Sequence, residues 1–398
     1  MSEFTEFLVI GCGPAGGVAA REAARAGVAT VVLERDAVVG AKRVCAAGLR
    51  PRFCERFDLP REIVHCDPAT LSLSTAKHNY RFSLEPAHTT TREELDGTIA
   101  ACARAEGAEI RTNALFRSLR RERDGIVVEY ADTKAGERRT IRARHVFLAQ
   151  GSSARLDEVD PRFRYEPWSA GLITCFQYRV YPAQPAVAHT YDTLEMHYYL
   201  SARDGRNIIA WMFPKRDHLA IGLGIMGKVN GAALRAELDA FVPMVQARLF
   251  PGIAYTVREE GNLLYGGSPR PVIGLDHLMV GGTAAGLVDA TTGEGIDEAA
   301  STGRFAAAAV GAVRAGGDPA VAYARATARA YHGRLRRRHK LMTFLERRPA
   351  RFDVLFEQFT RTPRFVELLQ QDRRDATLFD RLYLSAQAAK FSLRALGA

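Results

Sequence analysis

The sequence has 398 residues, of which 47% are hydrophobic and 25% charged, and its formal net charge is +10 at pH 7. This length and balance are typical of a globular protein with two or three domains' worth of core. The apolar runs are shorter than the ~18 residues that a membrane span needs, and no leader-like segment precedes the first apolar run. We therefore expect a cytoplasmic protein, either free or peripheral on the cytosolic face of a membrane.

The cysteines and the charge narrow the class of ligand. The six cysteines show no C-x-x-C spacing, so neither a metal site nor a disulfide framework is predicted. The positive charge suits an anionic partner such as a phosphate-bearing cofactor, a diphosphate substrate or an anionic lipid. The sequence has no helix-turn-helix, zinc or RNA-binding pattern, so we expect no nucleic acid partner.

An apolar run that ends in a glycine-rich turn opens the chain. Gly11, Gly13 and Gly16 stand in G-x-G-x-x-G spacing, and a second apolar run ends at Glu34. Gly11 permits the tight turn, Gly13 lets the backbone approach a pyrophosphate, and Gly16 lets the helix lie close to the strand. The helix N-terminus faces the anion, and the carboxylate can accept hydrogen bonds from ribose hydroxyls. The sequence thus predicts a dinucleotide site made of Gly11, Gly13, Pro14, Ala15, Gly16 and Glu34, with Arg35 at adenine or phosphate, or in solvent.

The remaining elements alternate between strands and helices. Thr91 is a candidate N-cap with Glu94 three residues on, the pattern of a capping box. Glu294 is placed at a helix N-terminus, where the helix dipole favours a carboxylate. In chain order, periodicity and turn residues predict a loop over 38–49, a helix over 52–57, short strands over 63–90, a helix over 91–107, a strand over 108–112, a hairpin of 126–130 with 140–144, a strand over 146–151, a strand-rich region over 165–265 with a helix at 231–249, a strand from 278, a helix over 297–314 and basic helices from 318.

Three glycine-rich turns at strand ends, near 11–16, 151 and 282–295, exceed what one Rossmann half requires. Their order resembles the FAD-binding fold of para-hydroxybenzoate hydroxylase and its relatives. In that group the second turn reads Asp-Gly and the third Gly-Asp, whose acid bonds the ribityl chain, while the next helix start faces the flavin ring. Here Gln150-Gly151 and Gly282-Thr283 replace them, which loses the charge-assisted part of each bond, about 1 kcal/mol. The resemblance implies FAD, held also by Gly151, Thr283, Gly293, Gly295 and Ile296.

Several motifs resemble the geranylgeranyl reductase family within that group. They are Lys42…Cys45-Ala-Ala-Gly48-Leu49, Trp211-Met-Phe213-Pro214-Lys215 and Gly293-Glu-Gly-Ile296, while Cys54–Pro60 and Leu378–Leu384 are closer to the chlorophyll and bacteriochlorophyll branch, which reduces geranylgeranyl to phytyl. The chain departs from the family pattern at Val44, an extra residue, at Ala46-Ala47 in place of paired glycines, and at Ile209-Ala210 in place of Tyr-Gly.

The resemblance implies an FAD-dependent reductase that saturates C=C bonds of a polyprenyl chain, with NADPH or ferredoxin as electron donor. It places Cys45 in the active site, Arg92 near the FAD, and Trp211, Phe213 and Pro214 at the substrate. Without it, the thiol reads as buried and inert, the arginine as a surface residue, and the aromatic residues as core. Two other functions stay open: an aromatic monooxygenase of the same fold, and a non-catalytic isoprenoid-binding flavoprotein.

The predicted fold class is α/β, a Rossmann-like FAD-binding domain with an inserted, mostly antiparallel β-sheet substrate domain and a helical C-terminal region. The FAD-binding domain is predicted over 1–62, 91–164 and 268–316, the substrate domain over 63–90 and 165–267, and the helical basic region over 317–398. Within the latter, Arg334–Lys340 reads either as a solvated helix face or as a site that docks on an anionic membrane, where each basic residue adds about 1 kcal/mol.

Overall fold

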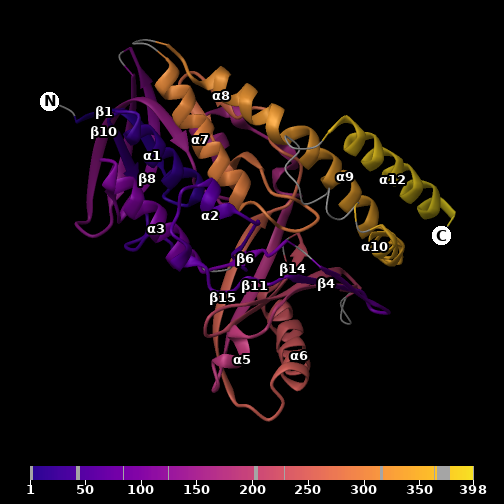
Figure 1. The fold of residues 1–398 in the computed structure, drawn as a ribbon. Coiled ribbons are helices and arrows are strands. Elements are labelled where there is room, and N and C mark those ends of the chain that lie inside the picture. Colours follow the sequence, from indigo (N-terminus) through magenta and orange to yellow (C-terminus); the bar gives the residue numbers. More distant parts are fainter. Residues whose placement is uncertain are drawn as a thin grey trace. The chain divides into compact units, whose positions relative to one another are not determined.

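The fold is given by a computed structural model (Figure 1). It describes residues 3–41, 45–83, 85–123, 125–200, 205–227, 229–313, 317–362, 364 and 377–397. The chain divides into two compact units. The first takes in Met1–Ile63, Thr90–Thr174 and Gly261–Lys340, and the second takes in Val64–Thr89, Cys175–Glu260 and Leu341–Ala398. The predicted helical region 317–398 is thus divided between the two units at Lys340.

The first unit is built on a sheet with a parallel centre, in the order β16-β17-β10-β1-β2-β7. β1 pairs in parallel with β10 and with β2. Leu8, Val9 and Ile10 are at most 2% exposed, as expected for a parallel strand that is covered on both faces. The bounds are β1 Phe4–Ile10, β2 Thr30–Leu33, β7 Glu109–Arg111, β8 Ala114–Glu122, β9 Gly125–Asp132, β10 Glu137–Leu148, β16 Gly274–Leu275 and β17 Leu278–Val280.

Helix α1 (Pro14–Arg25) packs against α3 (Arg92–Ala105) and α7 (Ile296–Ala312), which lie near it in Figure 1. Small residues allow this close approach. A Cβ added at Gly303 of α7 would lie 2.4 Å from the Ala15 carbonyl oxygen, and one at Gly17 would lie 2.6 Å from Ile99. Short elements complete the unit: β3 Gly48–Leu49, α2 Phe53–Arg56, α4 Leu156–Val159 and α8 Ala320–Thr327.

The second unit contains a sheet in the order β15-β11-β14-β13-β12-β4-β5. The pairs β12–β13, β13–β14 and β4–β5 are antiparallel, whereas β12 and β4 run parallel, so the sheet is mixed and only mostly antiparallel. The bounds are β4 Thr70–Ser74, β5 Asn79–Ser83, β6 His88–Thr89, β11 Leu172–Pro182, β12 Thr193–Leu200, β13 Asn207–Pro214, β14 Leu219–Met226 and β15 Tyr255–Tyr265.

One face of that sheet is covered by α6 (Gly231–Leu249). Leu238 and Val242 of the helix share a core with Ala210 and Met212 of β13. Because successive side chains of a strand point to opposite faces, Trp211 and Phe213 lie on the other face. Helix α10 (Arg351–Arg361) packs its aromatic side chains on Tyr80 and Tyr198. The last helices are α9 Gly333–Glu346 and α12 Leu378–Gly397.

The structure confirms some of the local predictions and contradicts others. The helix at Gly231–Leu249 is confirmed with the same bounds, and the Thr91 hydroxyl accepts the Glu94 N–H at 3.3 Å as predicted. The strands predicted at 140–144 and 146–151 are wrong as separate elements, since β10 runs without a break through Leu148. Nothing in the sequence reading placed a strand at β8, whose outer half is charged and exposed.

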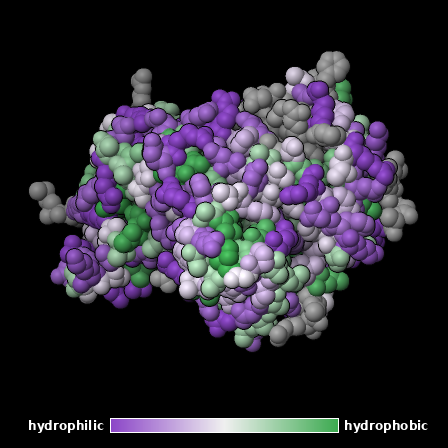
Figure 2. Space-filling model, turned by 60° about the horizontal axis from the view of Figure 1, so that its bottom comes forward, coloured by the Kyte–Doolittle hydropathy of each residue, from purple (hydrophilic) through white to green (hydrophobic). Residues whose placement is uncertain are grey.

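No helix within the described residues combines the length and apolar character that a membrane crossing requires. On the face that Figure 2 shows, hydrophobic residues form separate groups among hydrophilic ones. The large exposed hydrophobic side chains are likewise distributed along the sequence, among them Phe4, Val38, Met244 and Leu382. Singly exposed apolar residues are normal for a protein surface.

Candidate functional site

The glycine-rich turn between β1 and α1 has the backbone geometry of an anion site. Gly11 has φ +98°, and a Cβ there would lie 2.6 Å from the Ala149 carbonyl oxygen. A Cβ at Gly16 would lie 1.8 Å from the Gly11 carbonyl oxygen, so this position requires glycine. Pro14 and Ala15 form the first turn of α1, which has no acidic residue and whose N-cap, Gly13, makes no side-chain cap. The free amide groups and the dipole at this helix start favour a phosphate.

Glu34 lies beside this turn at the end of β2. Its Oε2 accepts the Cys12 N–H at 2.7 Å and its Oε1 accepts the Asp36 N–H at 3.0 Å. The two backbone bonds hold the carboxylate next to the turn. Arg35 instead projects outward, with 59% of its side chain exposed and its Nε 3.7 Å from Asp36 Oδ1.

Arg92 lies next to Gly13 and interacts with Cys45, which is far from it in the sequence. Arg92 is 8% exposed, and its guanidinium binds Asp96 through Nε at 3.0 Å and Nη2 at 2.5 Å. A Cβ at Gly13 would lie 3.4 Å from Arg92 Nη2. Burial alone would lower the pKa of Arg92, but Asp96 and the hydrogen-bonded Cys45 thiol raise it above its usual value. The surface reading of Arg92 is therefore wrong.

The loop around Cys45 is only partly described. The Ala47 N–H lies 3.4 Å from the Cys45 Sγ, and Ala47 has φ +45°. The predicted motif residues Lys42 and Val44 lie outside the described residues. The loop thus holds a half-buried thiol within reach of a buried cation.

The second turn, at the end of β10, carries buried polar atoms that lack a partner. Gly151 has φ +75°. The Gln150 Oε1 and the Ser152 Oγ are buried, and no hydrogen-bond partner for either exists among the residues described. Because buried polar atoms in proteins are nearly always hydrogen-bonded, these two fit a ligand that carries hydroxyl or phosphate groups. The residues present therefore fit FAD at this edge of the sheet.

The third turn follows β17. Gly282 has φ +58° and donates its N–H to Thr302 Oγ1 at 3.1 Å, while Thr283 is half-buried in the 3₁₀ turn Gly282–Ala285. A second tight turn then leads into α7. Asp289 N–H binds the Glu294 carbonyl at 2.8 Å, and Gly293, with φ +72°, donates to the Asp289 carbonyl at 2.8 Å. Gly295 is the N-cap of α7, and Ile296 is its first residue.

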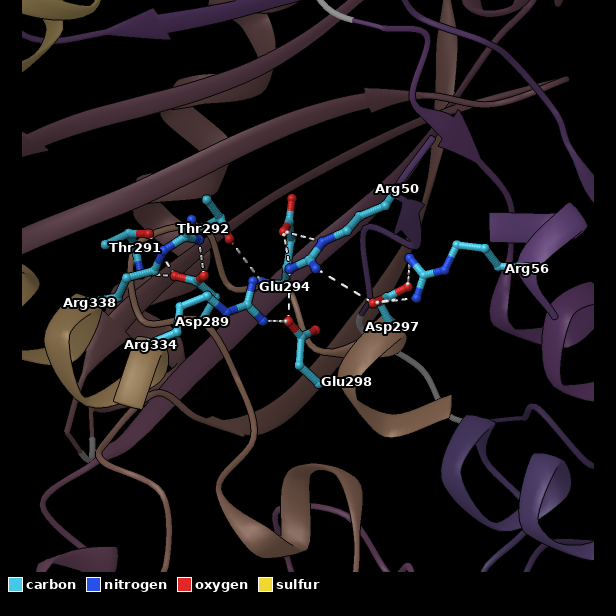
Figure 3. Close-up of polar contacts among 10 residues, drawn as sticks. All are labelled: Arg50, Arg56, Asp289, Thr291, Thr292, Glu294, Asp297, Glu298, Arg334 and Arg338. Atoms are coloured by element: carbon cyan, nitrogen blue, oxygen red, sulfur yellow. Dashed lines mark hydrogen bonds and ion pairs between the residues drawn. The ribbon is translucent and has the colours of Figure 1, made fainter. Parts of the chain in front are cut away.

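A charge network that the sequence reading missed surrounds this turn. Figure 3 shows four arginines pointing toward four carboxylates. Arg50 contacts Glu294 at 3.2 Å and Glu298 at 2.8 Å. Glu294, which was predicted to serve the helix N-terminus, pairs with Arg50 instead, and the first helical turn holds Asp297 and Glu298. The members are Arg50, Arg56, Arg334, Arg338, Asp289, Glu294, Asp297 and Glu298.

Two arginines of the basic run on α9 belong to this network. Arg334 forms an ion pair with Glu298, and Arg338 forms one with Asp289. Both carboxylates are 0% exposed. Burial would raise the pKa of Asp289, but Arg338 and Thr291 hold it below its usual value. These two basic residues therefore serve buried carboxylates, which neither sequence-based reading of the run anticipated.

The second unit places Trp211 in a fixed hydrogen-bond chain. The Trp211 Nε1 donates to Gln177 Oε1 at 2.9 Å, and Gln177 Nε2 donates to Glu260 Oε2 at 3.0 Å. Arg179 Nε lies 2.7 Å from Glu260 Oε1. A Cβ on Gly222 would lie 2.3 Å from the Trp211 ring, so the indole lies across this glycine. Sequence patterns did not reveal this chain, since its members come from three strands.

The other predicted substrate residues flank Trp211 on β13. Phe213 is half-buried, with its ring centroid 6.0 Å from Lys215 Nζ. Pro214 is buried, and its carbonyl oxygen accepts the Thr89 hydroxyl at 2.7 Å. Among the described residues no His, Cys, Asp and Glu cluster could hold a metal ion, and the six cysteines are free thiols.

Comparisons with known proteins agree with this geometry. The model of the FAD binding domain matches residues 4–159. A digeranylgeranylglycerophospholipid reductase from Methanoculleus marisnigri is 30% identical over 339 residues, which cover 79% of this chain and 78% of the relative. The chain belongs to the geranylgeranyl reductase family. It is accordingly an FAD-dependent oxidoreductase, and the family resemblance seen in its motifs is confirmed.

Solved structures show the same fold beyond this geranylgeranyl reductase family. A geranylgeranyl bacteriochlorophyll reductase-like protein from Thermoplasma acidophilum aligns with a TM-score of 0.70 and 20% identity, covering 96% of each chain. A p-nitrophenol 4-monooxygenase from Pseudomonas putida aligns with a TM-score of 0.70 and 16% identity, covering 90% of this chain and 94% of the other. The predicted fold class is confirmed by these alignments, which extend to a monooxygenase.

Proposed function

We propose that this geranylgeranyl reductase family member saturates C=C bonds of a polyprenyl chain. The observation that carries the proposal is the contact of Cys45 with Arg92, which itself lies beside Gly13, in a chain whose relative is named for reducing digeranylgeranylglycerophospholipid. A half-buried thiol in contact with a buried cation provides the polar groups that a reducing site would use.

FAD, once reduced by NADPH or by ferredoxin, supplies the hydride that saturation of a double bond requires. The turn at Gly11–Gly16 and the Glu34 carboxylate would hold the adenosine and pyrophosphate, and Gln150 would accept a hydrogen bond from a cofactor hydroxyl. Thr283 and the start of α7 would hold the ribityl and ring portions. The sequence has no second G-x-G-x-x-G after a strand, so NADPH would bind without a Rossmann domain of its own.

The remaining residues act on the substrate side. Arg92 donates toward the Cys45 sulfur, which fixes the orientation of the thiol, and the thiol or a water molecule delivers the proton to the second alkene carbon. Trp211 and Phe213 exclude water from the isoprenoid chain, because aromatic side chains bury large apolar surfaces.

The test is an anaerobic single-turnover reaction. The FAD of the purified protein is reduced with dithionite and mixed with geranylgeranyl diphosphate, geranylgeranylated chlorophyll pigment or digeranylgeranylglycerophospholipid, and the products are read by mass spectrometry. We expect the gain of one or more pairs of hydrogen atoms with one of these substrates. Cys45→Ser should keep bound FAD and slow product formation, whereas Cys102→Ser, at a half-buried cysteine of α3, serves as the control. Unchanged masses with every polyprenyl compound would refute the proposal.

The fold shared with p-nitrophenol 4-monooxygenase favours an aromatic monooxygenase as the second candidate. A monooxygenase consumes oxygen together with NADPH, whereas a reductase works without oxygen. Oxygen uptake with a phenolic substrate, and none of the hydrogen gain described above, would favour this candidate. A non-catalytic isoprenoid-binding protein is motivated by Gln150 and Thr283, and a purified protein that neither shows a flavin spectrum nor is stabilised by FAD would indicate it.

We also propose that α9 docks on anionic membranes, which hold isoprenoid lipids. Arg336, Arg337 and Lys340 are exposed, so three basic side chains of the run remain on the surface, each worth about 1 kcal/mol near an anionic bilayer. Co-sedimentation with phosphatidylserine liposomes at low salt, weakened in R336Q/R337Q, is the expected result. Equal sedimentation with neutral and anionic liposomes would contradict the docking.

A further inference from the structure

The first turn of α7 holds buried carboxylates at the end of the helix that favours anions. The side chains of Asp297 and Glu298 are 6% and 0% exposed. A helix N-terminus carries a partial positive charge of about half a unit. Two full negative charges in the same turn outweigh that partial charge unless cations compensate them. The potential at this helix start is therefore decided by the arginines that pair with the two acids.

Glu298 is compensated from two directions. The Arg50 Nη2 lies 2.8 Å from its Oε1, and Arg334 of α9 pairs with the same oxygen. The other oxygen, Oε2, is buried and accepts no hydrogen bond within the described part of the chain. Buried pairs are little screened by salt. Neutralising one member of such a pair therefore leaves the charge of its partner uncompensated, and that charge acts on nearby groups.

We propose that Arg334 and Glu298 form a charge-compensating pair that sets the midpoint potential of bound FAD. The inference rests on the proposed function, which places the flavin ring at the start of α7. Reduction of a flavin adds two electrons and need not add two protons, so the reduced cofactor is the more negative state. The negative charge of Glu298 disfavours the reduced cofactor, and the positive charge of Arg334 offsets that repulsion. Arg334 is a positioning residue in this scheme, since it acts through Glu298.

Arg338, the second arginine of α9 in the network, pairs with Asp289 in the turn that leads into α7. Asp289 accepts the Thr291 N–H at 3.1 Å and the Thr291 hydroxyl at 2.6 Å, and it pairs with Arg338. Figure 3 shows Arg334 and Arg338 side by side on one helix, directed at Glu298 and Asp289. The helix thus contributes one cation to the turn and another to the helix start, so residues far from the 4–159 match complete the cofactor site.

The experiment compares the midpoint potential and the FAD dissociation constant of the holoprotein variants, measured by dye-coupled reductive titration and by FAD fluorescence. Arg334→Gln should weaken binding of reduced FAD relative to oxidised FAD by about tenfold, a shift of about −30 mV for a two-electron couple. Glu298→Gln should shift the potential in the opposite direction. The double variant should return close to the wild-type potential. Arg329→Gln, at an exposed position of the helical turn that precedes α9, should leave it unchanged.

The outcomes separate charge compensation from simple support. A structural role would make both single variants lose FAD with shifts of the same sign, and that result would overturn the inference. If Arg334→Gln does not fold, Arg334→Lys keeps the charge and should keep the wild-type potential, while Glu298→Gln alone still has to raise it. A wild-type protein that binds no FAD would overturn the cofactor site as well. Bound FAD with an unchanged potential in every variant would overturn this inference alone.

Discussion

Replacing Glu34 with glutamine separates the two tasks of this side chain at the end of β2. In the structure the carboxylate accepts the Cys12 N–H at 2.7 Å and the Asp36 N–H at 3.0 Å. Glutamine has one acceptor oxygen, so only one of these two backbone donors keeps its partner. The same substitution removes the charge that a ribose hydroxyl would meet. Stability of the apoprotein and affinity for FAD should therefore both fall, for distinct reasons.

The expected losses in stability and in FAD affinity follow from the hydrogen bonds that Glu34→Gln removes. A hydrogen bond to a charged group contributes about 1.5–3 kcal/mol, and partial exposure of Glu34 places the loss in the free energy of unfolding near the lower end. If glutamine also loses one charge-assisted bond to the ribose, the dissociation constant for FAD rises by about 10- to 100-fold. Because Gln150 and Thr283 stand where acids are usual in this fold, we expect the first turn to carry much of the FAD binding, and the rise to fall in the upper part of that range.

The assay has two arms and a matched control. Urea denaturation of the apoprotein gives the change in stability, and quenching of FAD fluorescence gives the dissociation constant. Asp36→Asn removes the same charge two residues further on, from a side chain that is 40% exposed and lies beside Arg35. It should change neither quantity by much. An FAD affinity for Glu34→Gln that equals the wild-type value, or that of Asp36→Asn, would refute the role given to Glu34.

Four further substitutions each test a single position. Gly13→Ala should fold as stably as the wild type, because the new Cβ would lie no closer than 3.4 Å to its nearest neighbour, yet it should lose FAD in equilibrium dialysis. Gly16→Ala, whose new Cβ would lie 1.8 Å from the Gly11 carbonyl oxygen, should lower the melting temperature of the apoprotein, and equal melting temperatures would contradict this. Burial and a neighbouring histidine lower the pKa of His145 from 6.5 to about 4. The contribution of the neutral imidazole to stability is therefore full above pH 6.5 and is lost as the pH falls toward 4. His145→Leu should flatten the pH dependence of stability to urea between these values, and an unchanged slope would argue against this. In Gln177→Leu the Trp211 Nε1–H loses its acceptor. The fluorescence lifetime distribution of Trp211 should therefore broaden, and selectivity for polyprenyl length should relax. An unaltered lifetime would show that the indole is held by packing alone.

Only the tertiary structure reveals how the charges of distant segments are matched. The run of basic residues on α9 has the sequence of a solvated or membrane-facing helix, and three of its residues are exposed. Arg334 and Arg338 nevertheless meet carboxylates that are 0% exposed. The cost of burying Glu298 and Asp289 without partners would be several kcal/mol for each, so the fold brings these arginines to them. A local sequence pattern contains no information on which buried acid a given arginine will reach.

The sequence by itself determined the elements whose causes are local. The apolar run, three glycines and terminal acid predicted the strand, turn, helix and strand at the N-terminus. A backbone with φ +98° at Gly11, and the close approach of Gly16 in α1 to the Gly11 carbonyl, leave glycine as the only residue that fits. The N-cap at Thr91 and the helix Gly231–Leu249 were also predicted as observed, because the residues that determine them are local in the sequence. Strand β8 escaped because its outer residues are charged and exposed, so no apolar pattern marks them.

Tertiary structure decided how residues from different elements combine into a site. Arg92 lies beside Gly13 because α3 packs against α1, a contact that depends on Gly17 and Ile99 rather than on the motif itself. The Trp211 chain likewise joins side chains of three strands whose order in the sheet was not predicted. Spacing along the chain fixes φ, ψ and the buried face of each element. Which polar groups meet after burial depends on packing between elements, where desolvation makes a matched partner necessary.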